Sequence, residues 1–320
     1  MIQEMKDNYR QVSLSRFCRL LGMTRQAYYQ HCWHVEEITI EQEMVVRQVQ
    51  QLRKYHRHMG GRKLYEKLQP FMLEHQIKMG RDALFDVLSA NKLLVRKNKR
   101  RIHTTQSFHW LRKYPNLIKD FIPTAPGQLW VSDITYWQIS TGYIYLSFLT
   151  DAYSHKIVGY QVAETLETVE TLEALKMALS HLSRPRQLIH HSDRGIQYCS
   201  APYVKLLQDN GIRISMTENG DPRENAVAER INGIIKQEYL DGHQVNGADE
   251  ARELVSAAVE LYNTDRPHMS IGNLTPDLVH FNNLKTEKLW KNYHAKPNLV
   301  NAFQDKESPV NLFQDLIQKP

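Results

Sequence analysis

Apolar residues at helical spacing dominate the first hundred positions of the chain. A first helix is predicted over residues 13–21, and Gly22 ends it. Its apolar face consists of Leu14, Phe17 and Leu21. Thr24 can cap a second helix over residues 25–30, because a threonine hydroxyl accepts a hydrogen bond from the first turn. Two short helices joined by a glycine turn match the helix-turn-helix pattern, although many helical hairpins that bind no nucleic acid look the same.

A second pair of helices is predicted after Gly60-Gly61, over residues 62–68 and 81–88. Residues 96–101 follow, and five of these six are basic. Such a run is either a charged linker in water or a strap along a phosphate backbone, and its place after two helix pairs favours the strap. We therefore predict two helix-turn-helix domains, residues 1–55 and 56–122, the second of which includes the basic linker. Their predicted DNA contacts are Arg25, Gln26, Tyr28, Arg62, Lys63, Arg81, Arg96, Lys97, Lys99, Arg100 and Arg101.

The pattern changes after Pro126-Gly127, where β-branched and aromatic residues become frequent. Five strands are predicted, over residues 129–137, 143–150, 156–162, 188–191 and 212–216. Helices are predicted between the later strands, over residues 166–182 and 201–209, and another follows the last strand. The fold class is therefore α/β: a mixed five-stranded sheet flanked by helices, over residues 123–282, preceded by an all-α region and followed by a tail at 283–320.

Composition narrows the class of protein. Of the 320 residues, 42% are hydrophobic and 24% charged, which is typical of a globular chain. No run of about 18 apolar residues occurs, so we expect no membrane span. The N-terminus lacks the apolar core of a signal peptide. The three cysteines are far apart and odd in number, which indicates no disulfide framework and fits a reducing cytoplasm.

Charge is distributed unevenly along the chain. Residues 1–125 carry 23 Lys and Arg against 11 Asp and Glu, whereas residues 126–320 carry 18 against 24. A basic front half is typical of a module that binds a polyanion, and an acidic back half suits a site that gathers divalent cations. The alternative is two solvated surfaces with uneven charge.

The helix predicted after the last strand carries its apolar residues on one arc. Counted from Val227 at about 100° per residue, this arc also contains three isoleucines. They are Ile231, Ile234 and Ile235. Four polar residues fall on the face that we predict to point outward, namely Asn225, Glu229, Asn232 and Lys236. An exposed glutamate beside a lysine is usually a solvated surface pair, so Glu229 gains interest only from the rest of the chain.

Three acidic residues stand out by their context. Asp133 lies in the first predicted strand, Asp193 follows the fourth, and Glu229 is on the outward face of the helix. Sites in open α/β sheets form at the carboxyl ends of strands, which favours Asp193. Asp151 is better explained as a turn residue. His191 precedes Asp193 by two residues, and a packed histidine at a strand end is as compatible with the sequence as a functional one.

These three acids lie in segments that resemble the catalytic motifs of insertion-sequence transposases of the IS-three family. The segments are residues 130–136 (WVSDITY), 191–198 (HSDRGIQY) and 225–233 (NAVAERING). The resemblance extends to residues 262–268 (YNTDRPH) and to the two helix-turn-helix units, and it covers roughly residues 10–280. The order of the motifs and the 35 residues between the second aspartate and the glutamate agree with the family's pattern.

The resemblance implies an RNase H-like fold in which Asp133, Asp193 and Glu229 are the catalytic residues and hold two Mg²⁺ ions, with Mn²⁺ as a substitute. Hard divalent ions prefer carboxylate oxygens, and two ions can activate an attacking oxygen and stabilise a leaving one. It further implies that water cleaves the transposon ends to give a 3′-OH, which then joins to a second phosphate. The implied partners are double-stranded DNA, both terminal inverted repeats and target, and further copies of the chain in a homodimer or larger oligomer on paired ends. The implied location is the bacterial cytoplasm, at the nucleoid.

Further DNA contacts are expected close to the three acids. They are Arg194, Gln197, Asn225 and Lys236. Arg266 is also a candidate DNA contact, but the sequence leaves open whether Arg266 and His268 touch DNA or the core. Residues 300–305 and 310–315 (VNAFQD and VNLFQD) form a near-repeat, which is either a docking motif for a neighbouring protomer or part of a tail packed on its own core.

Two other function classes remain compatible with the sequence. A non-catalytic helix-turn-helix regulator would bind DNA through its basic half and use the sheet domain only to dimerise. A structure-selective RNase H-like nuclease would share the metal chemistry but would cleave without joining strands.

Overall fold

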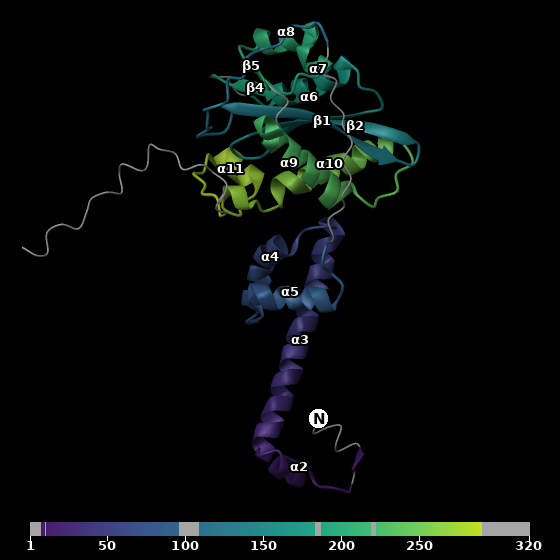
Figure 1. Ribbon diagram of the computed structural model, residues 1–320, viewed down its shortest axis with the longest axis vertical. Helices are drawn as coiled ribbons and strands as arrows, with labels where there is room; N and C mark the ends of the chain where they lie inside the picture. Colours follow the sequence, from purple (N-terminus) through teal and green to yellow (C-terminus); the bar gives the residue numbers. More distant parts are fainter. Residues whose placement is uncertain (1–7, 10, 96–108, 183–186, 219–221, 290–320) are drawn as a thin grey trace, which may run out of the picture.

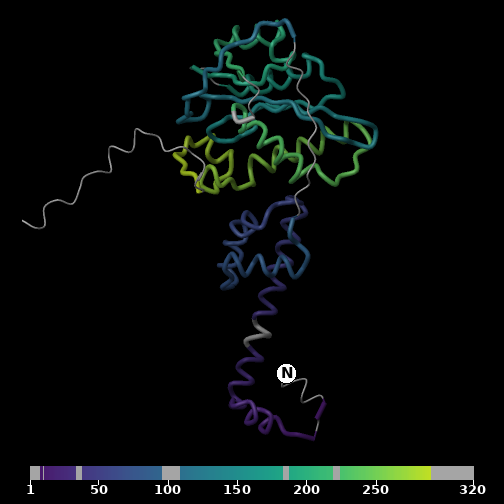
Figure 2. Tube along the Cα trace, in the orientation of Figure 1, coloured from purple at the N-terminus to yellow at the C-terminus, as the bar shows by residue number. Residues whose placement is uncertain are grey.

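The computed structural model describes residues 8–9, 11–95, 109–182, 187–218 and 222–289. A helical region and a mixed α/β core lie one after the other along the long axis of the molecule (Figure 1). The grey stretches of the tube in Figure 2 include the basic run at 96–101 and both copies of the near-repeat at 300–315. The predictions made for those segments therefore lie outside the described residues.

The helical region is built on one long helix. Its elements are α2 (Leu14–Leu20), α3 (Arg25–Tyr55), α4 (Gly61–Glu74) and α5 (Arg81–Ala90). The prediction of a short second helix at residues 25–30 is wrong, because those residues are only the start of the 31-residue α3, which contains no Gly or Pro to end it earlier. The predicted cap is confirmed: Thr24 Oγ1 accepts a hydrogen bond of 3.0 Å from Ala27 N.

Two small apolar clusters lie at the two ends of α3. Phe17 and Cys18 of α2 pack against the first turn of α3. Val45 and Val49, further along the same helix, pack against α4 and α5. The two helical units are thus joined by one continuous helix. No described helix, α3 included, is long and apolar enough to cross a membrane.

The predicted five-stranded mixed sheet is confirmed. The strands are β1 (Leu129–Ile139), β2 (Gly142–Asp151), β3 (Ile157–Ala163), β4 (Ile189–Ser192) and β5 (Arg213–Met216), in the order β3-β2-β1-β4-β5. The first three form an antiparallel meander, because tight turns join them. β4 runs parallel to both β1 and β5. Asp151, expected in a turn, is the last residue of β2, and its carboxylate accepts hydrogen bonds from Ser154 N in the turn that follows and from Gly127 N.

Helices cover both faces of this sheet (Figure 1). On one face lie α6 (Thr168–Ser180), α7 (Ile196–Cys199) and α8 (Ala201–Asp209). On the other lie α9 (Ala226–Ile234), which follows the short 3-10 turn η1 (Pro222–Asn225), the π-helix η2 (Ile235–Leu240) and α10 (Ala248–Thr264). The 3-10 turn η3 (Met269–Ile271) and α11 (Pro276–Asn282) close the described core. α6 packs so tightly on β3 that a Cβ at Gly159 would lie 2.2 Å from the carbonyl oxygen of Ala174.

Charged side chains join the helical region to the core. Glu238 of η2 pairs with Arg266, at 2.8 Å to both Nε and Nη2, and with Lys63 of α4, at 2.9 Å. Next to this pair, Asp265 forms an ion pair with Lys67 and lies 2.5 Å from Nε2 of His56 at the end of α3. Hydrogen bonds between charged groups are stronger than those between neutral groups. These ion pairs therefore hold α4 against the core.

Candidate active site

The sheet brings the two candidate aspartates close together. Ser132 of β1 and Ser192 of β4 are register partners in the parallel pair. Asp133 and Asp193 each directly follow one of these serines. The two aspartates are therefore neighbours across the sheet, one in β1 and one just beyond β4. Asp193 comes just after the carboxyl end of β4, where its Oδ1 accepts a hydrogen bond of 2.9 Å from Gly195 N. This is the strand-end position predicted from the sequence.

Helix α9 is tied to β1 by two asparagine amides. Asn225 Nδ2, just before the helix, donates to the carbonyl oxygen of Ser132 at 3.0 Å. Asn232 Nδ2 donates to Oδ2 of Asp133 at 2.9 Å. Glu229 lies between these two residues on the same side of the helix, because steps of three and four residues return to one face. Its side chain is exposed.

The charges of the other two acids act on Asp133. Its pKa is raised to about 8, chiefly by desolvation and in addition by the negative charges of Asp193 and Glu229. Hydrogen bonds from Ile134 N and from Asn232 oppose this shift. Acidic groups that raise one another's pKa in this way cluster at functional sites.

The three acids are not arranged as a ready-made metal site. Among the residues that the structure describes, no three His, Cys, Asp or Glu side chains are grouped so that they could hold a metal ion. Asp133 is partly buried, whereas Glu229 is exposed and has side-chain freedom to move closer. Their chemistry is that of three oxygen donors with surplus negative charge, which suits a hard divalent cation.

Lys236 lies along β1 beside Asp133. Its Nζ donates a hydrogen bond of 3.2 Å to Thr135 Oγ1 and lies 4.5 Å from the centre of the Tyr136 ring. Burial lowers the pKa of Lys236, while the charges of Asp241 and Asp133 act in the opposite direction. A cation is therefore placed near Asp133, and the DNA contact expected of Lys236 stays a prediction.

Several predicted DNA contacts are not on the surface. Asn225 is only 6% exposed and its amide is bound to the backbone of β1, so the prediction that it points outward to DNA is wrong. Arg266 and His268 are 1% and 5% exposed, which settles the open choice in favour of the core. Lys63 is largely buried in its ion pair with Glu238.

The other predicted contacts differ in exposure. Arg25, Gln26, Arg62 and Arg81 are exposed, whereas Tyr28 packs against the α2 cluster. Arg194 is partly buried, and Gln197 Nε2 donates to the carbonyl oxygen of Leu166. His191 is fully buried, with Nδ1 2.8 Å from Ser215 Oγ, so it is a packed strand residue.

Sequence reasoning missed the role of Asn232. Its predicted outward position is wrong: it is 4% exposed and binds the carboxylate of Asp133. The apolar arc counted from Val227 belongs to a core cluster that includes residues of β1, β2 and α10, and Ala228 packs against β1 as well, so more of α9 faces the sheet than the arc indicates. The spacing of Asn232, three residues after Glu229, was the one signal that could have placed it beside the acids.

Comparison with known proteins identifies the family. Two models of the integrase core domain match residues 123–222 and 210–276. The uncharacterized 31 kDa protein of insertion element IS600 from Shigella sonnei is 34% identical over 263 residues, which is 81% of this chain and 95% of that protein. The transposase InsF for insertion sequence IS3A from Escherichia coli strain K12 is 28% identical over 85% of this chain and 95% of that protein.

Solved structures show a more distant likeness. The HTLV-2 integrase catalytic core domain in complex with magnesium is 21% identical, with a TM-score of 0.40, over 49% of this chain and 97% of that one. The extent and identity of the match to the IS600 protein, together with the integrase core models, establish the family. The chain belongs to the IS3 family of insertion-sequence transposases, which carry an integrase core domain.

Proposed function

We propose that this chain is the DNA transposase of a bacterial insertion sequence, with Asp133, Asp193 and Glu229 as its catalytic residues. Water would cleave the transposon ends to leave a 3′-OH, and that hydroxyl would attack a second phosphate to join the strands. The observation that carries the proposal is the pairing of β1 with β4 at Ser132 and Ser192, directly before Asp133 and Asp193, together with the bond from Asn232 of α9 to Asp133. Three acids with 59 and 35 intervening residues between them are thereby brought toward one point, and the charges of Asp193 and Glu229 raise the pKa of Asp133.

We propose that these carboxylates hold Mg²⁺, as two ions, and that Mn²⁺ can replace it. The donor set fits, since Asp133, Asp193 and Glu229 offer only oxygen and carry charge that repels itself without a cation. When bound, such ions lower the pKa of an attacking oxygen and neutralise charge on a leaving one.

The chain's own side chains have separate parts in the proposed reaction. Asn232 holds the Asp133 carboxylate in one orientation, and Gly195 N does the same for Asp193. Lys236 places a positive charge beside β1, where it can contact the scissile phosphate.

The proposed partner is double-stranded DNA, both the terminal inverted repeats and the target. Exposed basic residues of the helical region, Arg25 and Arg62 among them, support this proposal. Joining two ends requires that both be held together, so we propose a dimer or larger assembly on paired ends.

The test is incubation of the full chain with Mg²⁺ and duplexes that end in the flanking inverted repeats, with nicked and joined products scored separately. We expect both products from the wild type and neither from Asp193→Asn or in EDTA. Cleavage without joining, on any duplex end, would identify a nuclease. Undiminished biological activity of Asp193→Asn would identify a non-catalytic regulator.

A further inference from the structure

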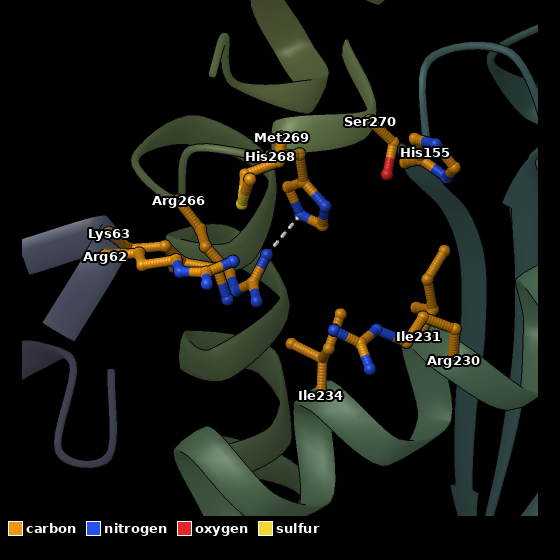
Figure 3. Close-up of a pocket in the computed structure, with 10 residues that line it drawn as sticks. All are labelled: Arg62, Lys63, His155, Arg230, Ile231, Ile234, Arg266, His268, Met269 and Ser270. Carbon is orange, nitrogen blue, oxygen red and sulfur yellow. Dashed lines mark hydrogen bonds between the residues drawn. The ribbon is translucent and has the colours of Figure 1, made fainter. Parts of the chain in front are cut away.

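A cavity of about 280 Å³ opens where α4 meets the core (Figure 3). Arg62 and Lys63 reach it from α4, and Arg230 reaches it from α9. Arg266 and His268 line it from the segment that follows α10. Cationic side chains from three separate parts of the chain thus converge on one hollow.

The positive charge of this cavity exceeds the negative charge beside it. Glu238 is the carboxylate that pairs with both Arg266 and Lys63. Arg62 and Arg230 are exposed and form no salt bridge with any other described residue. Of the four cationic side chains that line the cavity, two therefore pair with a carboxylate, and both use Glu238. Arg266 Nη1 is directed at His268 Nε2, 2.7 Å away, rather than at an acid (Figure 3).

The basic groups of the cavity disturb one another. The pKa of Lys63 is lowered to about 8, chiefly by burial and in addition by the charges of Arg266 and Arg230, while Glu238 acts in the opposite direction. Burial likewise lowers the pKa of His268 well below its usual value, followed by the charges of Arg266, His155, Lys63 and Arg230. An anion in the cavity would offset this repulsion.

We propose that the cavity binds one backbone phosphate of DNA, contacted by Arg62 and Arg230 at its mouth and attracted by the charges of Lys63 and Arg266 behind them. This inference rests on the proposed function, since it assigns DNA a second anchor point. Arg230 directly follows Glu229 in α9, and Arg62 belongs to the helical region. A phosphate held between them would fix the strand relative to both the catalytic acids and α4.

The geometry favours a phosphodiester over a purely structural role. The ion pairs of Glu238 already join α4 to the core, so Arg62 and Arg230 are not needed for that contact. Arginine presents several donors in a plane that matches phosphate oxygens. Two arginines on different elements that face one cavity can grip one phosphate from two sides.

The test measures DNA affinity of the full chain in EDTA, so that binding is separated from cleavage, with Arg62→Gln, Arg230→Gln and the double variant. Each single substitution should weaken binding about tenfold, and the double should weaken it little further, because both arginines hold the same phosphate. The matched control is Arg252→Gln, an exposed arginine of α10 that pairs with Asp249, and we expect no change. Equal melting temperatures would show that all variants fold.

Inorganic phosphate distinguishes the source of the anion. Phosphate should displace DNA from the wild type more effectively than chloride at equal ionic strength, and this difference should vanish in the double variant. Additive losses from the two single variants would overturn the shared phosphate. If inorganic phosphate raises the melting temperature of the wild type but the arginine variants bind DNA with unchanged affinity, the cavity binds a free anion and the proposed DNA contact is overturned. Failure of Mg²⁺-dependent cleavage with these binding results intact would refute the proposed catalysis alone.

Discussion

Asn232 Nδ2 donates a hydrogen bond of 2.9 Å to Oδ2 of Asp133, and this bond joins the middle of α9 to β1. The amide oxygen of Asn232 is buried and has no hydrogen-bond partner among the described residues. A buried polar atom without a hydrogen-bond partner destabilises the folded chain. The presence of the amide at this position is explained by the bond that its Nδ2 donates to Asp133. Asn232 therefore positions the carboxylate that the proposed metal ions would contact.

Replacement of Asn232 by alanine should weaken the response to Mg²⁺. Without the donated hydrogen bond, the Asp133 carboxylate loses its fixed orientation and a group that favours its charged form. We expect the Mg²⁺ concentration for half-maximal cleavage to rise about 10-fold to 100-fold. The control is Asn210→Ala, whose amide binds the carbonyl oxygen of Leu206 in α8, on the other face of the sheet. Identical Mg²⁺ curves for Asn232→Ala and wild type would refute the positioning role.

Asp133→Asn should abolish cleavage and yet stabilise the protein when divalent ions are absent. The substitution removes a desolvated carboxyl group that Asp193 and Glu229 repel. Asn232 can turn its amide so that its unpartnered oxygen accepts from the new side chain. Thermal melting in EDTA should show a higher midpoint than wild type, and added Mg²⁺ should raise the midpoint of the wild type only. Asp209→Asn, at the exposed end of α8, is the control, and a lower midpoint for Asp133→Asn would contradict the prediction.

Two glycines should respond oppositely to alanine. Gly159→Ala forces a methyl group against the Ala174 carbonyl oxygen, so β3 and α6 must separate, at a cost of about 1–3 kcal/mol. Gly233 lies within α9 and has open space around its Cβ position. Gly233→Ala should stabilise the chain by about 0.5–1 kcal/mol, because alanine loses less backbone entropy in a helix. Unfolding midpoints of both variants test this pair, and equal shifts would show that β3 and α6 are less closely packed.

Stability should fall as pH drops below about 6.5. Burial lowers the pKa of His190 to about 3, and burial together with Arg266 lowers the pKa of His268. Both histidines stay neutral in the folded chain while the unfolded chain takes up protons below its ordinary pKa. Their contribution to stability is thus present above about 6.5 and is lost as pH falls toward the folded pKa values, by up to about 1.4 kcal/mol per pH unit for each histidine.

The measurement is the free energy of unfolding between pH 7.5 and pH 5. His190→Gln keeps a polar group near Tyr203, which His190 contacts at 3.0 Å, and it should reduce the slope. His181→Gln, at the exposed end of α6, should leave the slope unchanged. Asp133, whose pKa is raised, contributes a slope of opposite sign over this range, so the comparison of variants is decisive: an unchanged slope in His190→Gln would contradict the assignment of a neutral buried histidine.

The sheet could be predicted because its strands carry an unambiguous local pattern. β1 and β2 are rich in β-branched and aromatic residues, and a short turn separates them. Residue type and turn signals therefore both predict two antiparallel strands. α3 was predicted too short, since the helix-turn-helix pattern describes only the start of a helix whose continuation depends on the absence of breakers. The π-helix η2, which turns Glu238 toward Arg266, has no local sequence signal.

The candidate acids could be found from the sequence, but their supporting contacts could not. A helical wheel assumes that polar residues face water, and Asn225 and Asn232 instead satisfy groups on β1. Arg266 shows the same limit, because a cation that pairs with a distant glutamate is indistinguishable in sequence from one that binds DNA.

The continuous α3 sets the distance between the two helical units that it joins. At 1.5 Å per residue, the part of α3 from Arg25, beside α2, to Val45, which packs on α4 and α5, spans roughly 30 Å. That length corresponds to about nine base pairs of duplex. Any insertion or deletion within this span would change both the separation and the rotation of the two helical units, so its residue count matters more to their spacing than the identity of its exposed side chains.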